Sequence, residues 1–135
     1  KKKKKESAIM VGIDSSGSVS TKLLEKFSSQ LYWISKNSDI DVVVCDTKIN
    51  DRFRYKKNAD LKITGRGGTE FQPVIDEYLA NKKKYSCLIY FTDGECPAPN
   101  VKFAKESILW VTYGNYYNDE LNSVGHQVHI EEKDI

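Results

Sequence analysis

Four short apolar runs divide the chain. They are AIMVGI at residues 8–13, VVVC at 42–45, LIYF at 88–91 and ILWV at 108–111. None contains a charged residue, and each consists largely of aliphatic or aromatic side chains. Runs this short are typical of strands buried on both faces, as in a parallel sheet covered by helices. They therefore predict the central strands of an α/β domain.

Helical periodicity occurs in two places between these runs. Apolar residues recur every three or four positions over residues 23–34, and either Ser20 or Thr21 would cap that helix. A second helix is expected over residues 72–80, because its apolar positions share one face. Each predicted helix lies between two predicted strands, as in a sheet with helices on its faces.

Weaker patterns predict the remaining elements. Residues 52–55 form a short strand after a turn at 50–51, residues 118–121 form a helical turn, and the alternating residues 126–132 form an edge strand. The expected order is strand, helix, strand, strand, helix, strand, strand, strand. This order predicts a doubly wound, Rossmann-like α/β fold. Its central sheet has about six strands, mostly parallel, with one antiparallel edge strand.

Length and charge limit the organisation of the chain. We assign residues 7–135 to one domain and residues 1–6 (KKKKKE) to a basic linker or the end of an upstream element, with a basic arm for phosphate or acidic lipid as the alternative. The chain starts without Met, so we expect it to be part of a longer protein. A net charge of +2 gives no reason to expect nucleic acid as a partner. No run approaches the ~20 apolar residues of a membrane span, so no membrane partner is expected.

Three cysteines, Cys45, Cys87 and Cys96, bear on the compartment. Their number is odd and two of them belong to apolar segments, which argues against a disulfide framework. Buried free thiols are typical of a reducing environment. We therefore expect a cytoplasmic protein.

Polar residues follow the predicted strands at three points. The first strand ends in Asp14-Ser15-Ser16-Gly17-Ser18, the LIYF strand ends in Thr92-Asp93-Gly94, and the sequence GRGGT at 65–69 precedes the second helix. In an open parallel sheet, ligands bind outside the carboxyl ends of the strands. The three segments are therefore expected to converge on one crevice.

The side chains in these segments offer only oxygen atoms. Carboxylates come from Asp14 and Asp93, and hydroxyls come from Ser16, Ser18 and Thr69. Oxygen ligands select hard cations, so we expect Mg²⁺, with Mn²⁺ or Ca²⁺ as alternatives. Such a shell leaves the ion under-neutralised if the aspartates act through water. A partner protein offering Asp or Glu could then replace a water and complete the coordination.

Each segment also has a structural explanation when it is considered alone. The first is compatible with an Asx turn followed by a helix cap, and Asp93-Gly94 with a turn. Thr69 and Gln72 match a capping box, T-x-x-Q. Pro73 argues against that box, because the carbonyl of an N-cap at Thr69 would need the amide hydrogen that Pro73 lacks. The conjunction of the three segments, rather than any single one, favours a metal site.

These residues resemble a known family. D-S-S-G-S, a Gly-Gly-Thr before a helix and a strand ending in Thr-Asp-Gly are similar to the metal-ion-dependent adhesion site of von Willebrand factor A domains, and the resemblance spans residues 7–132. It implies that Ser16 and Ser18 bind the ion directly, and that Thr69 does so in some states. It further implies that Asp14 and Asp93 act directly or through water, and that a partner's Glu or Asp supplies the last ligand.

Four segments, VVVCDTKI, GRGGTEFQPV, YFTDGECPAP and LWVTYG, look most like the VWA-like domain at the C-terminus of bacterial metallopeptidase-like proteins. That resemblance implies an upstream peptidase-like domain, which is a possible partner within the same protein. The chain is short for the wider family, and little room remains for helices after Pro97. We therefore expect some of the sheet to be thinly covered, which would suit docking or self-association.

Other functional residues have alternative explanations. His126 and His129 form an H-x-x-H pair, but positions three apart on a strand face opposite sides, which suits zinc poorly. Cys96 follows Asp93 closely and is either a loop residue, a ligand for a softer metal or a redox-sensitive thiol. Asp46 either accepts hydrogen bonds beside the crevice or belongs to a turn. Three tyrosines at 113, 116 and 117 form either a contact surface or a packed loop.

Two other functional classes remain. A metal-dependent hydrolase, similar to phosphatases with an Asp after the first strand, would need a nucleophile and a general acid. Ser16 stands where the haloacid-dehalogenase pattern has a second Asp, and Arg66 is the one basic residue suited to phosphate. A structural oligomerisation domain would not need the complete set of oxygen ligands. We therefore expect a binding module and not an enzyme.

Overall fold

The computed structural model describes residues 8–57, 65–131 and 133, so the basic run at residues 1–6 lies outside it. Two α-helices and two 3₁₀ helices accompany six strands. The helices are α1 (Thr21–Ser35), α2 (Gln72–Ala80), η1 (Lys105–Ser107) and η2 (Asp119–Ser123). The strands are β1 (Ala8–Asp14), β2 (Ile40–Cys45), β3 (Ile49–Arg54), β4 (Tyr85–Thr92), β5 (Ile108–Tyr113) and β6 (His126–Ile130). This order of strands and α-helices is the predicted one.

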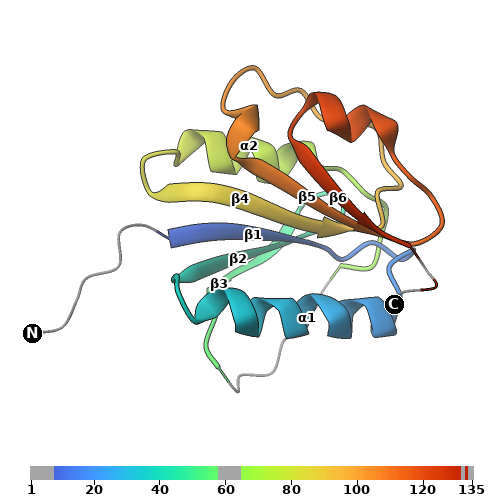
Figure 1. The fold of residues 1–135 in the computed structure, drawn as a ribbon, viewed down its shortest axis with the longest axis horizontal. Helices are drawn as coiled ribbons and strands as arrows, with labels where there is room; N and C mark the ends of the chain where they lie inside the picture. The colour runs from blue at the N-terminus through green and yellow to red at the C-terminus, as the bar shows by residue number, and fades with distance from the viewer. Residues whose placement is uncertain (1–7, 58–64, 132, 134–135) are drawn as a thin grey trace, which may run out of the picture.

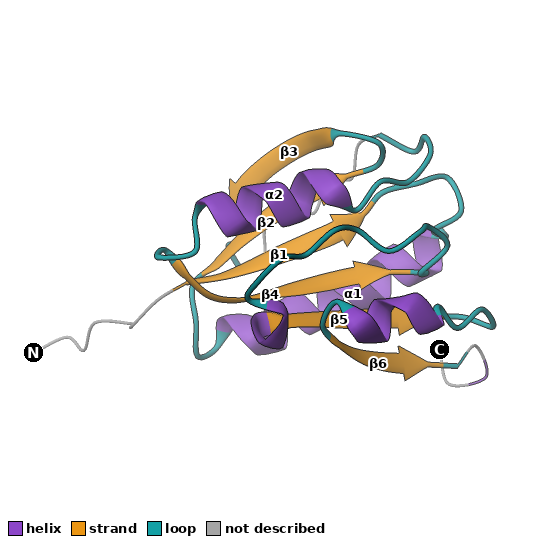
Figure 2. Ribbon diagram, turned by 90° about the horizontal axis from the view of Figure 1, so that it is seen from above, coloured by secondary structure: helices purple, strands orange, loops and turns teal. Residues whose placement is uncertain are grey.

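The six strands form one sheet in the order β3-β2-β1-β4-β5-β6. β1 pairs in parallel with both β2 and β4, and β5 pairs in parallel with both β4 and β6. The antiparallel edge strand is β3, which pairs with β2, and its arrow in Figure 2 points opposite to that of β1. These features confirm the predicted doubly wound, mostly parallel sheet with one antiparallel edge.

Each face of the sheet is covered by one α-helix (Figure 1). On the α1 face, Phe27 stacks on Phe91 with ring centroids 5.2 Å apart and contacts Tyr113 at 5.4 Å. On the α2 face, Tyr90 stacks on Trp110 at 5.1 Å. These aromatic residues are fully or almost fully buried. Buried apolar surface of this kind supplies much of the stabilising free energy of a small domain. Both sides of the central strands are therefore packed, as their apolar sequences predicted.

Different residues mark the start of each α-helix. Ser20 caps α1, because its Oγ accepts a hydrogen bond from the Leu23 amide at 3.1 Å. α2 begins after Phe71, with Pro73 in its first turn and no side-chain cap. Thr69 therefore does not cap α2, in agreement with the argument from Pro73.

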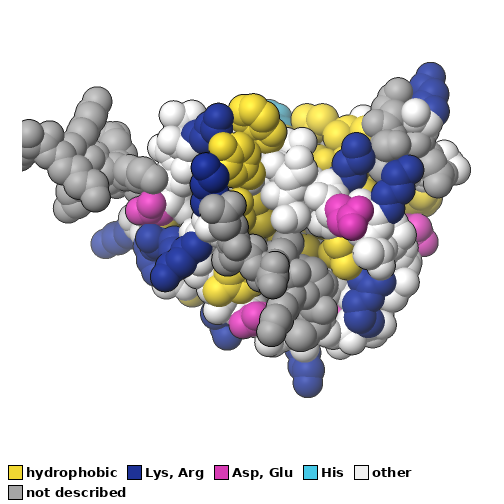
Figure 3. Space-filling model, turned by 90° about the horizontal axis from the view of Figure 1, so that it is seen from below, with side chains coloured by type: hydrophobic (Ala, Val, Ile, Leu, Met, Phe, Trp, Pro, Cys, Tyr) yellow, Lys and Arg dark blue, Asp and Glu magenta, His cyan; other side chains and the backbone are white. Residues whose placement is uncertain are grey.

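Only 3₁₀ helices follow β4 in the described residues, and η2 coincides with the predicted turn near 118–121. Large apolar side chains remain exposed, including Trp33 at 59% and Phe103 at 61%. Figure 3 shows the α1 face, where hydrophobic side chains reach the surface beside lysine and arginine side chains. There, Lys36 Nζ lies 4.4 Å from the ring centroid of Trp33. Across the residues described, none of the helices combines the length and apolarity needed to cross a bilayer.

Candidate functional site

The carboxyl ends of β1 and β4 meet at the centre of the sheet. The chain adds β2 on the far side of β1 and β5 on the far side of β4, so the winding direction reverses between β1 and β4. Such a reversal opens a crevice at the strand ends, where doubly wound proteins bind ligands. Asp14 is the last residue of β1, and Asp93 directly follows β4. Both predicted carboxylates therefore lie at the point where this fold places a binding site.

Asp14 is completely buried and is held by two hydrogen bonds. Its Oδ1 accepts from the Ser16 amide at 2.9 Å, and its Oδ2 accepts from Thr92 Oγ1 at 2.5 Å. Burial raises the pKa of Asp14; the hydrogen bonds from Thr92 and Ser16 oppose this rise only in part, and the charge of Asp93 adds to it. The two carboxyl groups are thus close enough to repel each other.

Asp93 is also buried, with 5% of its surface exposed, but only one of its carboxylate oxygens accepts a hydrogen bond from the described residues. Its Oδ1 accepts from the Glu95 amide at 3.1 Å. Its Oδ2 is buried and has no hydrogen-bond partner among the described residues. Buried polar atoms are nearly always satisfied, so an orphaned carboxylate oxygen requires an explanation. A bound cation would supply one, and the oxygen-only donor set fits Mg²⁺.

The two serines lie between the buried carboxylate and solvent. Ser16 is buried and Ser18 is exposed, and their Oγ atoms are 3.1 Å apart. Ser18 and Asp93 also line a common cavity of about 350 Å³. The crevice therefore offers hydroxyl and carboxylate oxygens and opens to solvent on the side of Ser18.

Main-chain hydrogen bonds join the GRGGT segment to the loop after β1. The Arg66 amide donates to Ser15 O at 2.8 Å, and the Gly17 amide donates to Gly67 O at 2.8 Å. Thr69 is half-buried, and its carbonyl accepts from Cys96 Sγ, 3.5 Å away, in the loop after β4. The structure therefore brings the three predicted segments together.

Asp46 explains the conformation of this segment. Its Oδ2 accepts from the Gly67 amide at 3.0 Å, and its Oδ1 accepts from Asn50 Nδ2 at 2.8 Å. At Gly65, where φ is +113°, a Cβ atom would lie 2.8 Å from Asp46 Oδ2 and 2.5 Å from Asn50 Nδ2, so only glycine fits. Both alternatives for Asp46 hold. It accepts hydrogen bonds that position the loop, and it belongs to the turn after β2, where its Oδ1 also accepts from the Lys48 amide at 3.3 Å.

Two residues that organise the site had no predicted role. Thr92 joins the end of β1 to the loop after β4, because its hydroxyl donates to Asp14 and accepts from the Gly94 amide at 3.0 Å. Asn118 is 2% exposed, and its Nδ2 donates to Gly94 O at 2.9 Å and to Cys96 O at 2.8 Å. Thr92 could have been noticed because it directly precedes Asp93. The local sequence favoured a helical turn at Asn118, but no local pattern marks its bonds to Cys96 O and Gly94 O, which lie 22 and 24 residues away.

The cysteines and His129 are held by the surrounding structure. Burial raises the pKa of Cys45 to about 12 and that of Cys96 to about 11, so both thiols are protonated at neutral pH. The ring nitrogens of His129 lie 2.8 Å from Thr112 Oγ1 and 2.9 Å from Gly114 O. Within residues 8–57, 65–131 and 133, no three His, Cys, Asp or Glu side chains converge as metal ligands. A metal site at this crevice would therefore depend on the serine and threonine hydroxyls.

Comparison with known proteins places the chain in a family. Residues 9–128 match the model of the VWA-like domain (DUF2201). An uncharacterized protein of Thermotoga maritima is 34% identical over 112 residues, which are 80% of this chain but 27% of the relative, so the chain spans about a quarter of that protein. The crystal structure of the ArnB paralog VWA2 from Sulfolobus acidocaldarius matches 95% of this chain and 41% of its own, with a TM-score of 0.58 and 17% identity, which supports the fold. The chain belongs to the VWA-like domain (DUF2201) family.

Proposed function

We propose that this domain is a metal-dependent protein-binding module. A VWA-like fold suggests a protein-interaction module in general, and the crevice between β1 and β4 adds the oxygen ligands. In this proposal the ion is held by Asp14, Ser16, Ser18, Thr69 and Asp93. The observation that carries it is the buried Asp93 Oδ2, which has no partner in the described chain and lies near a second buried carboxylate.

Mg²⁺ is the proposed ion, with Mn²⁺ or Ca²⁺ as substitutes, because all the donor atoms are oxygens. When bound, the ion supplies positive charge at the mouth of the crevice, where an Asp or Glu of the partner can reach it. Ser18 is exposed, so the open coordination position faces solvent. The domain itself is proposed to bind and not to catalyse.

The surrounding residues prepare the site. Thr92 and Ser16 fix the orientation of the Asp14 carboxylate by hydrogen bonds to both of its oxygens. Asp46 fixes the segment that carries Thr69 through the Gly67 amide. Such preorganisation lowers the ordering cost of binding. In the proposed assembly, the domain is the C-terminal part of a larger intracellular protein whose upstream region is metallopeptidase-like, as the sequence resemblance implies.

Titration calorimetry with MgCl₂ and MnCl₂ tests the metal site. We expect the wild type to bind one ion and Asp93→Asn to lose binding while its circular dichroism spectrum is unchanged. Asp41→Asn, which removes a carboxylate at the other end of the sheet, is the matched control and should bind as the wild type does. Absence of binding by the wild type at millimolar metal would overturn the proposal. Metal-dependent turnover of a phosphate ester, lost in Asp93→Asn, would favour an enzyme instead.

A further inference from the structure

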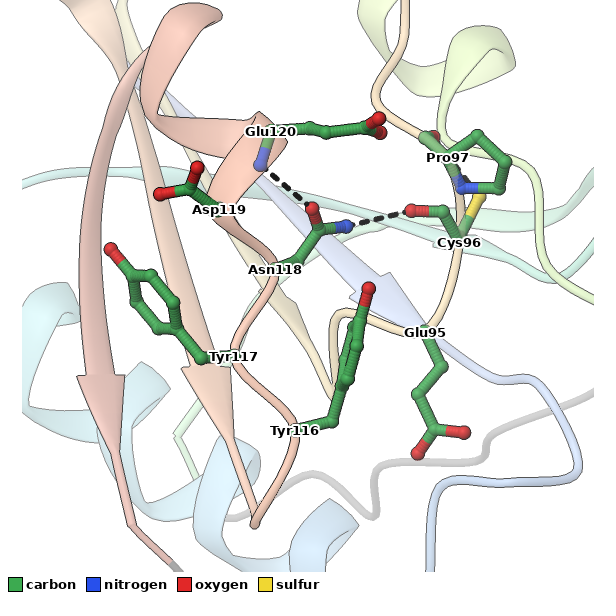
Figure 4. Close-up of a pocket in the computed structure, with 8 residues that line it drawn as sticks. All are labelled: Glu95, Cys96, Pro97, Tyr116, Tyr117, Asn118, Asp119 and Glu120. Atoms are coloured by element: carbon green, nitrogen blue, oxygen red, sulfur yellow. Dashed lines mark hydrogen bonds between the residues drawn. The ribbon is translucent and has the colours of Figure 1, made fainter.

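We propose that a second cavity, next to the metal site, binds a lysine or arginine side chain of the protein partner. This cavity has a volume of about 630 Å³ and lies between the loop after β4 and the segment leading into η2. We call it the tyrosine-acidic pocket (Figure 4). Its functional walls are formed by Glu95, Pro97, Tyr116, Tyr117, Asp119 and Glu120.

The charge of the pocket is opposite to that of the protein. Three carboxylates, those of Glu95, Asp119 and Glu120, line it, and among the described residues no Lys, Arg or His does so. The whole chain carries a net charge of +2, so this negative region is a local feature. Charge complementarity therefore selects a cationic group as the occupant.

Aromatic side chains supply the second element of cation recognition. Tyr116 is 51% exposed, so its ring surface is available. Tyr117 is 47% exposed, and its ring also packs edge-on with the His129 ring at a centroid distance of 5.4 Å. In Figure 4, Tyr116 rises between Glu95 and Asn118, and Tyr117 lies beside Asp119. Cations are attracted to tyrosine ring faces, and a guanidinium group can stack on them as well.

The walls of the pocket are fixed before any ligand arrives. Asn118 joins them, because its Nδ2 bonds the carbonyls of Gly94 and Cys96 while its Oδ1 accepts from the Glu120 amide at 3.0 Å. Glu120 Oε1 in turn accepts from the Ala98 amide at 3.3 Å. A preformed pocket loses little conformational entropy on binding.

The arrangement suits an organic cation better than a metal ion. Metal ions require several oxygen ligands within about 2.6 Å of one point. In the described parts of the chain, no three acidic, histidine or cysteine side chains converge in that way. Carboxylates spread around a wide cavity match the extended donors of a guanidinium or the mobile end of a lysine.

The pocket lies next to the proposed metal site. Glu95 and Tyr116 line both the tyrosine-acidic pocket and the cavity that contains Ser18 and Asp93. This part of the inference rests on the proposed function. A partner whose acidic residue reaches the ion would place a basic residue, a few positions away, in the pocket.

Nuclear magnetic resonance titration in the absence of metal tests the pocket by itself. The probes are N-acetyl-arginine amide and N-acetyl-lysine amide, with N-acetyl-glutamine amide as the neutral control. We expect the two cations, but not the neutral probe, to shift the amide signals of Tyr116, Tyr117 and Glu120. The double variant Asp119→Asn/Glu120→Gln should bind about fivefold more weakly. Glu106→Gln, which removes one carboxylate at η1, should bind as the wild type does. Absent shifts at the pocket, or equal binding by the double variant, would overturn the inference.

A second titration separates this inference from the proposed function. The peptides acetyl-Asp-Gly-Gly-Arg-amide and acetyl-Asp-Gly-Gly-Gln-amide are compared with and without Mg²⁺. Tighter binding of the arginine peptide under both conditions supports the pocket, and an additional gain with Mg²⁺ supports the metal site. A gain with Mg²⁺ but no preference for arginine overturns the pocket alone. A preference for arginine without any effect of Mg²⁺ overturns the metal site alone.

Discussion

Carboxylates occur at both ends of the sheet, but only those at one end are neutralised. At the amino end, Asp41 accepts from Arg54 Nε at 2.6 Å and from Tyr85 OH at 2.8 Å, and Lys84 Nζ lies 3.3 Å away. At the carboxyl end, Asp14 and Asp93 are more deeply buried, yet in the described chain no ion pair reaches them. The protein thus pairs the partly exposed Asp41 with cationic side chains. It leaves Asp14 and Asp93, whose deeper burial costs more free energy, without a cationic partner.

The pKa shifts express the same difference. Burial acts to raise the pKa of Asp41, but the hydrogen bonds from Arg54 and Tyr85 and the charge of Arg54 lower it below its ordinary value. Burial raises the pKa of Asp14, and its neutral hydrogen-bond partners do not reverse that rise. A buried carboxyl group whose pKa is shifted in this way is typical of a functional site. The amino end thus stabilises the fold, and the carboxyl end carries the buried carboxylates on which the proposed metal site rests.

The largest expected effect comes from supplying the missing cation. With Mg²⁺ at a hundredfold excess over its Kd, we expect the melting temperature of the wild type to rise by about 10 °C. Asp93→Asn should show almost no rise, because it loses a charged ligand. Differential scanning calorimetry with and without Mg²⁺ measures both. An equal rise in Asp93→Asn would mean that the ion binds elsewhere.

The next effect concerns the bridge between the two strand ends. Thr92→Val leaves the Asp14 carboxylate without one donor and the Gly94 amide without its acceptor. We expect the free energy of unfolding, measured by urea titration, to fall by about 2 kcal/mol. Thr92→Ser keeps the hydroxyl and should recover most of this loss. An unchanged stability of Thr92→Val would show that the hydroxyl bridge contributes nothing.

A smaller effect is expected at the amino end. Asp41→Asn removes the ion pairs with Arg54 and Lys84, whose side chains are about half exposed, so solvent screening limits the loss to about 1 kcal/mol. Metal affinity should remain unchanged. A clear loss of Mg²⁺ binding in this variant would contradict the separation of the two ends.

The smallest effect is a dependence on pH. The pKa of Asp41 is lower in the folded state than its ordinary value of 3.8, so its contribution is complete above that value and is lost as pH falls through the folded pKa. The gap in unfolding free energy between the wild type and Asp41→Asn should therefore be widest near pH 6 and narrow below pH 3. Urea titrations at these two pH values measure the gap. A gap that widens in acid would show that Asp41 is not held as the ionised carboxylate.

The fold was largely predictable because its strands are buried on both faces. The four apolar runs marked β1, β2, β4 and β5, and the residues proposed for α2 match its observed bounds. β3 begins three residues earlier than the predicted Arg52, since its polar sequence contains little apolar signal. The predicted convergence of the three segments is found in the structure, because parallel strands bring distant residues to one edge of a sheet.

The details of the site depended on side-chain contacts that the sequence does not encode locally. The tyrosines separated into buried Tyr113 and exposed Tyr116 and Tyr117, which no periodicity distinguished. The bridging of Thr92 and Asn118 became apparent only from the packing of the loops. Metal binding, the absence of enzymatic activity and the cytoplasmic location stay predictions.

The main-chain bonds between the loop after β1 and the GRGGT segment have a consequence for protein engineering. The bonds from the Arg66 amide to Ser15 O and from the Glu70 amide to Asp46 O do not involve the side chains of Arg66 or Glu70. Both residues are exposed at the rim of the crevice. The Glu70 side chain can therefore be varied in a combinatorial library while the loop framework keeps its shape. The Arg66 guanidinium, in contrast, donates a hydrogen bond to Val19 O and helps to hold that framework. The domain is thus a scaffold on which new binding specificities can be selected.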